Sequence, residues 1–326
     1  DVTGPDEYTA LVDNNYYTNR MAQEHLRHAV AVVQDMAGHA PAALAALEQK
    51  LGLSAQEVED WSRAAEAMYL PYDERLGIVA QDDSFLDKPQ WDFAGTPPEQ
   101  YPLLMHHHPL TLYRHQVCKQ ADALLALVLA GGQVDRATRR RSFDYYEAVT
   151  VHDSTLSASS FAVLAAEVGH AQKAQDYFMG GLRVDLDDLH ANASHGAHMA
   201  AMAGSWLALT WGFGGMRVEA AGLHFDPMLP TAWRGYRFGV FWKDRSIAVA
   251  VDAVMAHYTL VEGASLGIVH AGQSVLLREG VTQSLALTGQ RERDAPAPSS
   301  TTAFPRPFKG IVFDLDGVLA DTAHLH

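Results

Sequence analysis

The sequence predicts a mainly α-helical protein with a smaller β domain on its C-terminal side. Residues 14–212 show helical spacing of apolar residues with capping signals, whereas residues 216–287 are short runs of β-forming residues separated by turns. The 326 residues include 48% hydrophobic and 19% charged residues, which is a globular composition and enough chain for two domains. We therefore expect an all-α barrel or toroid that lacks its first part, followed by a β-sandwich.

The helical part opens with a strongly periodic segment at 15–35. Ser54 and Glu57 have the spacing of a capping box, which predicts a helix that runs to about Leu70. Residues 71–109 form a long loop rich in proline and aspartate, and a loop of that length inside a domain is usually functional. Further helices are expected at 42–50, 110–130, 135–148, 155–168, 170–179 and 194–211.

The β part predicts a small sandwich, because its short strands follow one another at the spacing typical of such domains. Strands are expected at 236–242, 247–251, 258–261, 266–269 and 274–277, with a hairpin connection at 243–246. Proline and serine mark a linker after this region. The expected organisation is a helical domain at 1–212, a β domain at 213–288, a linker at 289–307 and the start of another domain at 308–326.

Bulk properties narrow the possible partners. The formal net charge of −15 argues against nucleic acid or an anionic membrane as the main partner. Cys118 is the single cysteine, so no intrachain disulfide can form, and no apolar run is long enough to span a bilayer. The chain starts at Asp1 without an initiator methionine, and we interpret this as a cut end.

The first candidate for chemistry is the loop Gly4-Pro5-Asp6-Glu7-Tyr8. Glycine and proline favour a rigid loop, and a rigidly held carboxylic acid is what cleavage of a glycosidic bond needs to protonate the leaving oxygen. The competing interpretation is a capped loop with solvated acids, which composition alone favours.

Two further stretches carry polar groups beside helices. Lys119 and Asp122, three residues apart in the expected helix 110–130, would share one face as a surface ion pair or as a buried group with partners. The polar loop 151–157 opens a helix and could bind an oxyanion with its N–H groups and hydroxyls, or could simply cap that helix through Ser154 or Thr155.

Histidines and aspartates mark two more stretches. His190, His195 and His198 lie within nine residues, but their spacing matches no zinc pattern, so we predict no metal there and favour His198 as an anion ligand. Near the end, a buried strand runs into Asp314-Leu315-Asp316-Gly317, which suits an aspartyl nucleophile, an acid/base partner and Mg²⁺.

Four of these stretches together resemble glycoside hydrolase family 65, in the family's order, over roughly residues 1–288. They are Gly4–Tyr8 with Val12–Asn15, Tyr113–Asp122, Thr150–Ser157 and His198–Trp206. The family consists mainly of phosphorylases of maltose, trehalose, kojibiose and nigerose, with some hydrolases. Its architecture implies that this chain is a partial (α/α)6 barrel followed by a C-terminal β-sandwich.

The resemblance also implies roles for individual residues. Glu7 would be the general acid, and Lys119, Gln120 and Glu147 would contact the donor glucose. Ser154, Ser157, Gly196 and His198 would form the phosphate site. The segment before His198 departs from the family's usual Asp-Gly-x-His. A histidine at 198 favours phosphorolysis, because the family's hydrolases carry a glutamate there.

The implied reaction is inverting phosphorolysis of an α-linked glucose disaccharide, namely maltose, trehalose, kojibiose or nigerose, to β-glucose 1-phosphate and glucose. Phosphate is then a substrate, no cofactor is needed, and the family resemblance implies a homodimer. The phosphorylated product and the single cysteine favour the cytoplasm. The alternatives are an inverting α-glucoside hydrolase of the trehalase type and a catalytically inactive carbohydrate-binding fragment.

The end of the chain resembles the start of β-phosphoglucomutase, a haloacid dehalogenase-like enzyme. Asp314 and Asp316 would be its nucleophile and acid/base residue, and Mg²⁺ would be needed by a complete mutase domain. Nineteen residues predict no mutase activity of their own. The resemblance supports phosphorolysis, because such a mutase consumes β-glucose 1-phosphate.

Overall fold

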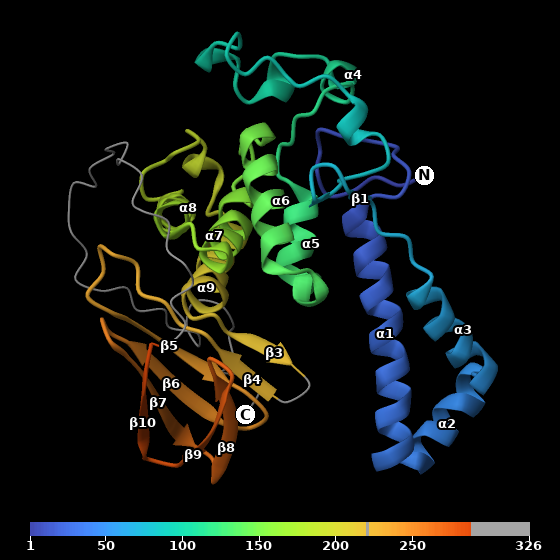
Figure 1. Ribbon diagram of the computed structural model, residues 1–326, viewed down its shortest axis with the longest axis vertical. Coiled ribbons are helices and arrows are strands. Elements are labelled where there is room, and N and C mark those ends of the chain that lie inside the picture. Colours follow the sequence, from blue (N-terminus) through green and yellow to red (C-terminus); the bar gives the residue numbers. More distant parts are fainter. Residues whose placement is uncertain (220–221, 288–326) are drawn as a thin grey trace. The chain divides into compact units, whose positions relative to one another are not determined.

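The computed structural model describes residues 1–219 and 222–287, which form two compact units, one up to Ser157 and one from Ala158 onward. Helices dominate the first unit, and the second unit combines helices with two β-sheets (Figure 1). The predicted fold class, mainly helical with a C-terminal β domain, is confirmed. The predicted linker 289–307 and the start of a further domain at 308–326 lie outside the described residues.

The helices of the first unit begin where the sequence places caps. The side chain of Asn15 accepts a hydrogen bond from the Thr18 amide, and Ser54 accepts one from the Glu57 amide. The helices are α1 (Tyr16–His39), α2 (Pro41–Leu51), α3 (Ala55–Glu66), α4 (Pro109–Leu112), α5 (Asp122–Ala130) and α6 (Arg136–Val149). Helix α1 packs against α2, α3 and α5.

Two predicted helices of this unit are wrong in extent. Helix α3 ends at Glu66, not near Leu70. The continuous helix expected at 110–130 is broken into the short α4 and α5, with an irregular segment between them. Lys119 lies in that segment and Asp122 is the first residue of α5, so the two do not share a helix face.

The long loop predicted at 71–109 contains strands β1 (Tyr72–Asp73) and β2 (Ile78–Val79) and several 3₁₀ turns. It projects beyond the ends of α5 and α6 in Figure 1. The loop has a small core of its own, because its buried apolar side chains pack on one another and on residues before and after it. The buried members of this loop core are Tyr8, Trp91, Leu103, Leu112 and Val117.

The second unit contains α7 (Ser157–Val168) except for its first residue, together with α8 (Ala171–Arg183) and α9 (Met199–Leu207). Helix α9 continues as a π-helical turn at Ala208–Phe213. The helix predicted at 194–211 therefore starts later than expected. Residues 193–195 form a separate 3₁₀ turn, after which Gly196 has a φ of 124° that a continuous helix cannot accommodate.

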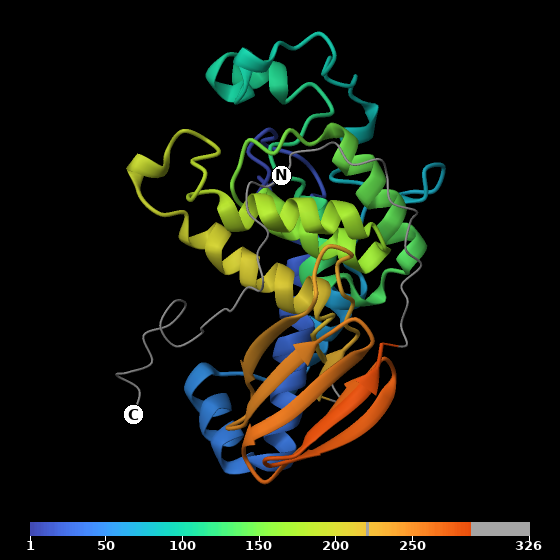
Figure 2. The same cartoon turned by 90° about the vertical axis from the view of Figure 1, so that its left-hand side faces the viewer.

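Two four-stranded sheets follow. Their strands are drawn as the yellow to red arrows in Figure 2. One has the order β10-β7-β6-β5 and the other β3-β4-β8-β9. The strands are β3 (Arg217–Glu219), β4 (Gly222–Phe225), β5 (Tyr236–Phe241), β6 (Ser246–Val251), β7 (Met255–Glu262), β8 (Ser265–His270), β9 (Gln273–Arg278) and β10 (Thr282–Ala286). Buried and exposed residues alternate along β5, which is the signature of a sheet with one face in the core.

The hairpin predicted at 243–246 joins β5 to β6. Lys243 and Asp244 have φ values of 47° and 58°, the left-handed values of a type I′ turn. Trp242 and Arg245 close the turn by exchanging backbone hydrogen bonds of 2.8 and 3.1 Å. Within the part of the chain that the structure describes, no helix is long and apolar enough to cross a membrane.

Candidate active site

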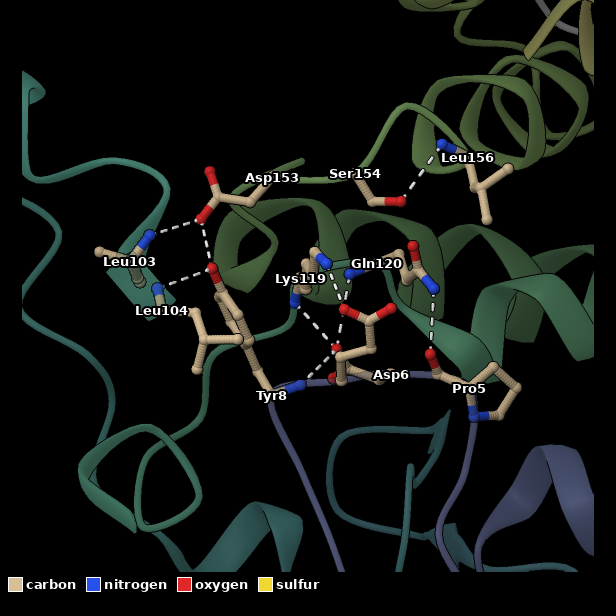
Figure 3. A network of polar contacts seen from close by, with 11 residues as sticks. Pro5, Asp6, Tyr8, Leu103, Leu104, Lys119, Gln120, Asp153, Ser154 and Leu156 are labelled. Carbon is tan, nitrogen blue, oxygen red and sulfur yellow. Dashed lines mark hydrogen bonds and ion pairs between the residues drawn. The ribbon is translucent and has the colours of Figure 1, made fainter. Parts of the chain in front are cut away.

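The acid-bearing loop at the start of the chain is fixed by the buried carboxylate of Asp6. Its Oδ1 accepts the backbone amides of Lys119 at 2.9 Å and Tyr8 at 3.2 Å (Figure 3). Its Oδ2 accepts the Gln81 side chain at 3.0 Å. Asp6 is fully buried. Burial raises the pKa of Asp6, and these hydrogen bonds oppose that rise. The interpretation of this loop as two solvated acids is therefore wrong for Asp6.

Glu7, the predicted general acid, is exposed, unlike the buried Asp6 before it. Its side chain is 57% exposed and forms an ion pair with the Lys119 ammonium, whose side chain is 20% exposed. Asp6 precedes Glu7 in the chain and also receives the Lys119 amide. One buried carboxylate thus holds the backbone on both sides of the Glu7–Lys119 ion pair.

Gln120 joins the same loop from the other side. Its side-chain Nε2 donates to the Pro5 carbonyl at 3.0 Å, while its Oε1 is buried and makes no hydrogen bond with the described residues. This amide oxygen can still accept a hydrogen bond, for example from a hydroxyl group of a ligand. The structure therefore brings three predicted site residues, Glu7, Lys119 and Gln120, onto one pair of neighbouring segments.

Behind these residues lies a second buried carboxyl group, that of Asp122. Its Oδ2 accepts the Asn15 side chain at 3.0 Å, and its Oδ1 makes no hydrogen bond with the described residues. Burial, together with the nearby charge of Asp6, raises the pKa of Asp122 to about 8. Gly4 touches this group so closely that an added Cβ would lie 2.6 Å from Asn15 Nδ2.

Tyr8 connects the acid loop to the predicted phosphate loop. Its hydroxyl donates to Asp153 Oδ2 at 2.5 Å and accepts the Leu104 amide at 3.3 Å, and Asp153 also accepts the Leu103 amide at 2.8 Å (Figure 3). Burial, then the hydrogen bond to Asp153, raises the pKa of Tyr8. The ring of Tyr8 belongs to the loop core. Three distant segments therefore meet at this tyrosine.

The predicted phosphate loop carries Ser154 one residue after Asp153. The Ser154 hydroxyl accepts the Leu156 amide at 3.3 Å, and the Ser157 amide bonds to the Ser154 carbonyl at 3.2 Å. Ser157 is buried at the start of α7, and its hydroxyl lies 2.8 Å from His152 Nδ1. Burial lowers the pKa of His152 to about 4, so this imidazole is neutral near pH 7.

Glu147, predicted to line the sugar pocket, lies on the last turns of α6 and is partly buried. It follows Tyr145 and Tyr146, which anchor the helix. Tyr146 is fully buried and donates to the Val79 carbonyl at 3.0 Å, and Tyr145 donates to Gln116 at 2.5 Å.

The remaining phosphate-site candidates, Gly196 and His198, belong to the second compact unit, whereas Ser154 and Ser157 belong to the first. Asp185 accepts both the His198 backbone amide at 2.8 Å and the His198 Nδ1 at 2.5 Å. These hydrogen bonds lower the pKa of Asp185. Because Asp185 holds Nδ1, the Nε2 of His198 is the ring atom left for a ligand.

Sequence reasoning missed several residues that organise this region. Asp6 and Asp153 appear in the quoted motifs without a role, and Asp122 appears only as a neighbour of Lys119. Gln81 and Asp185 have no part in the predicted site. Four of these five residues have hydrogen-bond partners that lie far away in the sequence. Local sequence patterns therefore do not reveal their roles. Asp185, with a partner 13 residues away, could have been found by asking what orients His198. Among the described residues, no group of side chains has a metal-ligating arrangement.

The arrangement in the first unit suits acid chemistry on a polyhydroxylated substrate. A half-exposed carboxyl group sits beside an ammonium group and an amide oxygen, and buried hydrogen bonds hold their backbones. Such fixed positions are what general acid catalysis requires.

Comparison with known proteins identifies the family to which this chain belongs. Residues 1–207 match the glycosyl hydrolase family 65 central catalytic domain, and residues 216–277 match the family 65 C-terminal domain. The chain is 49% identical over 267 residues to an α,α-trehalose phosphorylase of Geobacillus stearothermophilus, covering 82% of this chain and 35% of that protein. It is 36% identical over 267 residues to a maltose phosphorylase of Bacillus subtilis, covering 81% and 34%.

A solved chain from the human microbiome, assigned as a kojibiose phosphorylase, superposes with a TM-score of 0.77 at 27% identity, covering 87% of this chain and 39% of that one. The chain spans about a third of the length of the curated relatives it matches. The family model for the catalytic domain accounts for more than half of the present sequence. On this evidence the chain belongs to glycosyl hydrolase family 65.

Proposed function

We propose that this chain is part of an inverting phosphorylase of an α-linked glucose disaccharide, with Glu7 as the general acid. Glu7 protonates the interglycosidic oxygen while inorganic phosphate attacks the anomeric carbon from the opposite face. The products are β-glucose 1-phosphate and glucose. Phosphate replaces the water and the second carboxylate of an inverting hydrolase, because it is already an anionic nucleophile.

The observation that carries this proposal is the anchoring of Glu7 and Lys119 by one buried carboxylate. Asp6 receives the Lys119 amide and precedes Glu7, so the acid and its ammonium partner cannot drift apart by backbone motion. A donor sugar whose hydroxyl groups bind Lys119 and Gln120 is thereby held next to the carboxyl group that donates the proton.

The phosphate site of the proposal combines Ser154 and Ser157 with Gly196 and His198. Asp185 supports the part played by His198, since it fixes the imidazole through Nδ1 and leaves Nε2 for the anion. Helix α9 follows His198 directly, and the N-terminus of a helix favours negative charge.

The deciding experiment measures product with the intact open reading frame and purified disaccharides. We would incubate it with trehalose, maltose, kojibiose and nigerose, each with and without inorganic phosphate, and assay β-glucose 1-phosphate and glucose. Trehalose comes first, because the two α,α-trehalose phosphorylases are 49% and 44% identical to this chain. Phosphate-dependent β-glucose 1-phosphate supports the proposal. Equal glucose with and without phosphate indicates a hydrolase, and no turnover indicates a binding protein.

Glu7→Gln tests the assigned acid in the same protein. The variant keeps the shape of the side chain but cannot donate the proton, so we expect kcat to fall by about 10²–10⁴. Glu74→Gln, an exposed acid outside the site, is the matched control and should keep the wild-type rate. A Glu7→Gln variant with the wild-type kcat would remove Glu7 from the mechanism.

Three wider assignments complete the proposal. The protein forms a homodimer and acts in the cytoplasm, where its phosphorylated product is retained. The segment that carries Asp314 and Asp316 begins a β-phosphoglucomutase-like domain that consumes this product, with Mg²⁺ bound when that domain is complete. The resemblance of Phe313–Leu319 to the mutase motif supports this last point.

A further inference from the structure

The buried carboxyl groups of Asp6 and Asp122 lie beside the acid-bearing loop. They differ in how many hydrogen-bond donors the protein supplies to each. Asp6 accepts backbone amides from Tyr8, Lys119 and Gln120, and the Gln81 side chain. Several N–H donors converging on one carboxyl group stabilise its ionised form. The donors around Asp6 therefore suit a negative charge.

Asp122 has the opposite surroundings. It is 1% exposed, and its Oδ1 finds no hydrogen-bond partner among the described residues. The charges of Asp6 and Asp82, in flanking loops, disfavour a negative charge on Asp122. Cys118 in the preceding segment and Tyr146 on α6 also lie near it, and burial raises the pKa of both, so they stay uncharged near pH 7. From α1, the neutral Asn15 side chain faces it.

The two groups are connected through the backbone as well as by charge. The backbone N–H of Asp6 hydrogen-bonds the carboxyl group of Asp122, while the side chain of Asp6 accepts the amides that precede Asp122. These hydrogen bonds hold the loop that carries Glu7 against the segment that carries Lys119, and we call the pair Asp6 and Asp122 with these bonds the buried clamp. A second negative charge in the buried clamp would push the two segments apart.

We propose that Asp6 and Asp122 form a buried carboxyl pair with one negative charge, located on Asp6, that positions Glu7 and Lys119 for catalysis. This inference rests on the proposed function for its catalytic consequence, although the charge state itself does not depend on it. Asp6 and Asp122 touch no substrate in this arrangement. They act through the residues beside them, as positioning residues.

The first test is the pH dependence of stability, which does not require activity. An aspartate in the unfolded chain loses its proton near pH 4, whereas folded Asp122 keeps it up to about pH 8. Between these values the folded protein holds the extra proton, so stability falls as pH rises through the window. Thermal unfolding of the intact protein at pH 5 to 8 should therefore show a wild-type Tm that falls more steeply than that of Asp122→Asn, which has no proton to lose.

The second test is the pH dependence of kcat. Ionisation of Asp122 above pH 8 places a second charge in the clamp, so wild-type kcat should fall more between pH 7 and 9 than kcat of Asp122→Asn. Asp6→Asn removes the charge that holds the amides and should lower kcat by roughly 10- to 100-fold at every pH. Asp83→Asn, an exposed neighbour of Asp82, is the matched control and should follow the wild type in both measurements.

The outcomes separate the two proposals. Parallel Tm profiles of wild type and Asp122→Asn would overturn the single-charge pair, whatever the enzyme does. A steeper wild-type Tm profile in a protein without phosphate-dependent turnover would keep the charge state and reject the proposed function. Matching kcat profiles alongside a steeper wild-type Tm profile would overturn the positioning role. If Asp6→Asn does not fold, the Tm and kcat profiles of wild type and Asp122→Asn still test both the charge state and the positioning role.

Discussion

At the scale of single residues, the site depends on groups whose importance comes from burial. Asp6 and Glu7 are adjacent and both acidic, yet one is fully buried and the other is exposed. The sequence predicted Glu7 through a family resemblance. It could not predict the anchor, because the amide that Asp6 accepts comes from Lys119, 113 residues away. Long-range hydrogen bonds of this kind leave no local pattern.

Gly4 should tolerate no side chain. An added Cβ would lie 2.6 Å from Asn15 Nδ2 and against the Asp122 carboxyl group, both held by hydrogen bonds in the buried clamp. Gly4→Ala should therefore destabilise the protein by roughly 1–3 kcal/mol, measured by urea unfolding. Gly38→Ala is the control, because it lies within α1 with open space around it and should be neutral or stabilising by up to about 1 kcal/mol. Equal effects of the two substitutions would contradict the close packing at Gly4.

The Tyr8 hydroxyl should contribute measurably to stability. It donates to Asp153 at 2.5 Å and accepts the Leu104 amide, so Tyr8→Phe leaves buried polar groups with fewer partners. We expect a loss of roughly 1–3 kcal/mol and faster proteolysis of the loop 71–109. Tyr17→Phe, on α1 and partly exposed, is the control. Unchanged stability in Tyr8→Phe would mean that the hydroxyl does not secure the loop.

At the scale of elements, local signals located most helices and strands but failed where distant partners decide. Residues between α4 and α5 have a helical pattern, yet Cys118 pairs in parallel with Thr150 and the next amide bonds to Asp6. These partners offer the backbone an alternative to the helix. The predicted capping box at Ser54 and the predicted hairpin at 243–246 were correct, because each depends on neighbours in sequence.

The hairpin between β5 and β6 can be stabilised by changing its second turn residue. Asp244 has a φ of 58°, which glycine adopts without strain. Asp244→Gly should therefore raise stability by about 0.5 kcal/mol, and Asp244→Ala should lower it by a similar amount. Thermal unfolding of both variants checks the prediction, and a stabilising alanine would show that the turn does not hold this conformation in solution.

The segment between α8 and α9 should control the response to phosphate. Asp185 holds His198 through two hydrogen bonds, so Asp185→Asn loosens the imidazole that the proposal assigns to the anion. We expect KM for phosphate to rise roughly tenfold while KM for the disaccharide stays unchanged. The control is Asp187→Asn, two residues after Asp185, which removes an ion pair with Arg183. A rise in both KM values for Asp185→Asn would point to general damage.

At the scale of the whole molecule, the domain boundary indicated by the sequence differs from the boundary between the two compact units. The sequence changes character near residue 213, and the two family models end at 207 and begin at 216. The compact units instead join α7, α8 and α9 with the sandwich. Aromatic rings explain why, because Trp233 lies between the helices and the first long strand. Its ring contacts Phe178 at 5.3 Å, Phe213 at 5.2 Å and Tyr236 at 6.1 Å between centroids.

This aromatic cluster predicts that α8 and β5 unfold together. Trp233→Ala removes the ring that touches both, so it should cost roughly 2–4 kcal/mol. Hydrogen exchange should then accelerate in α8 and β5 to the same extent, because the two elements share one core. Trp242→Ala is the matched control, since its ring lies under the Lys243 ammonium at the hairpin. Faster exchange in β5 alone would show that the helices and the sandwich are stabilised separately, with the cooperative boundary near residue 213 where the sequence changes character.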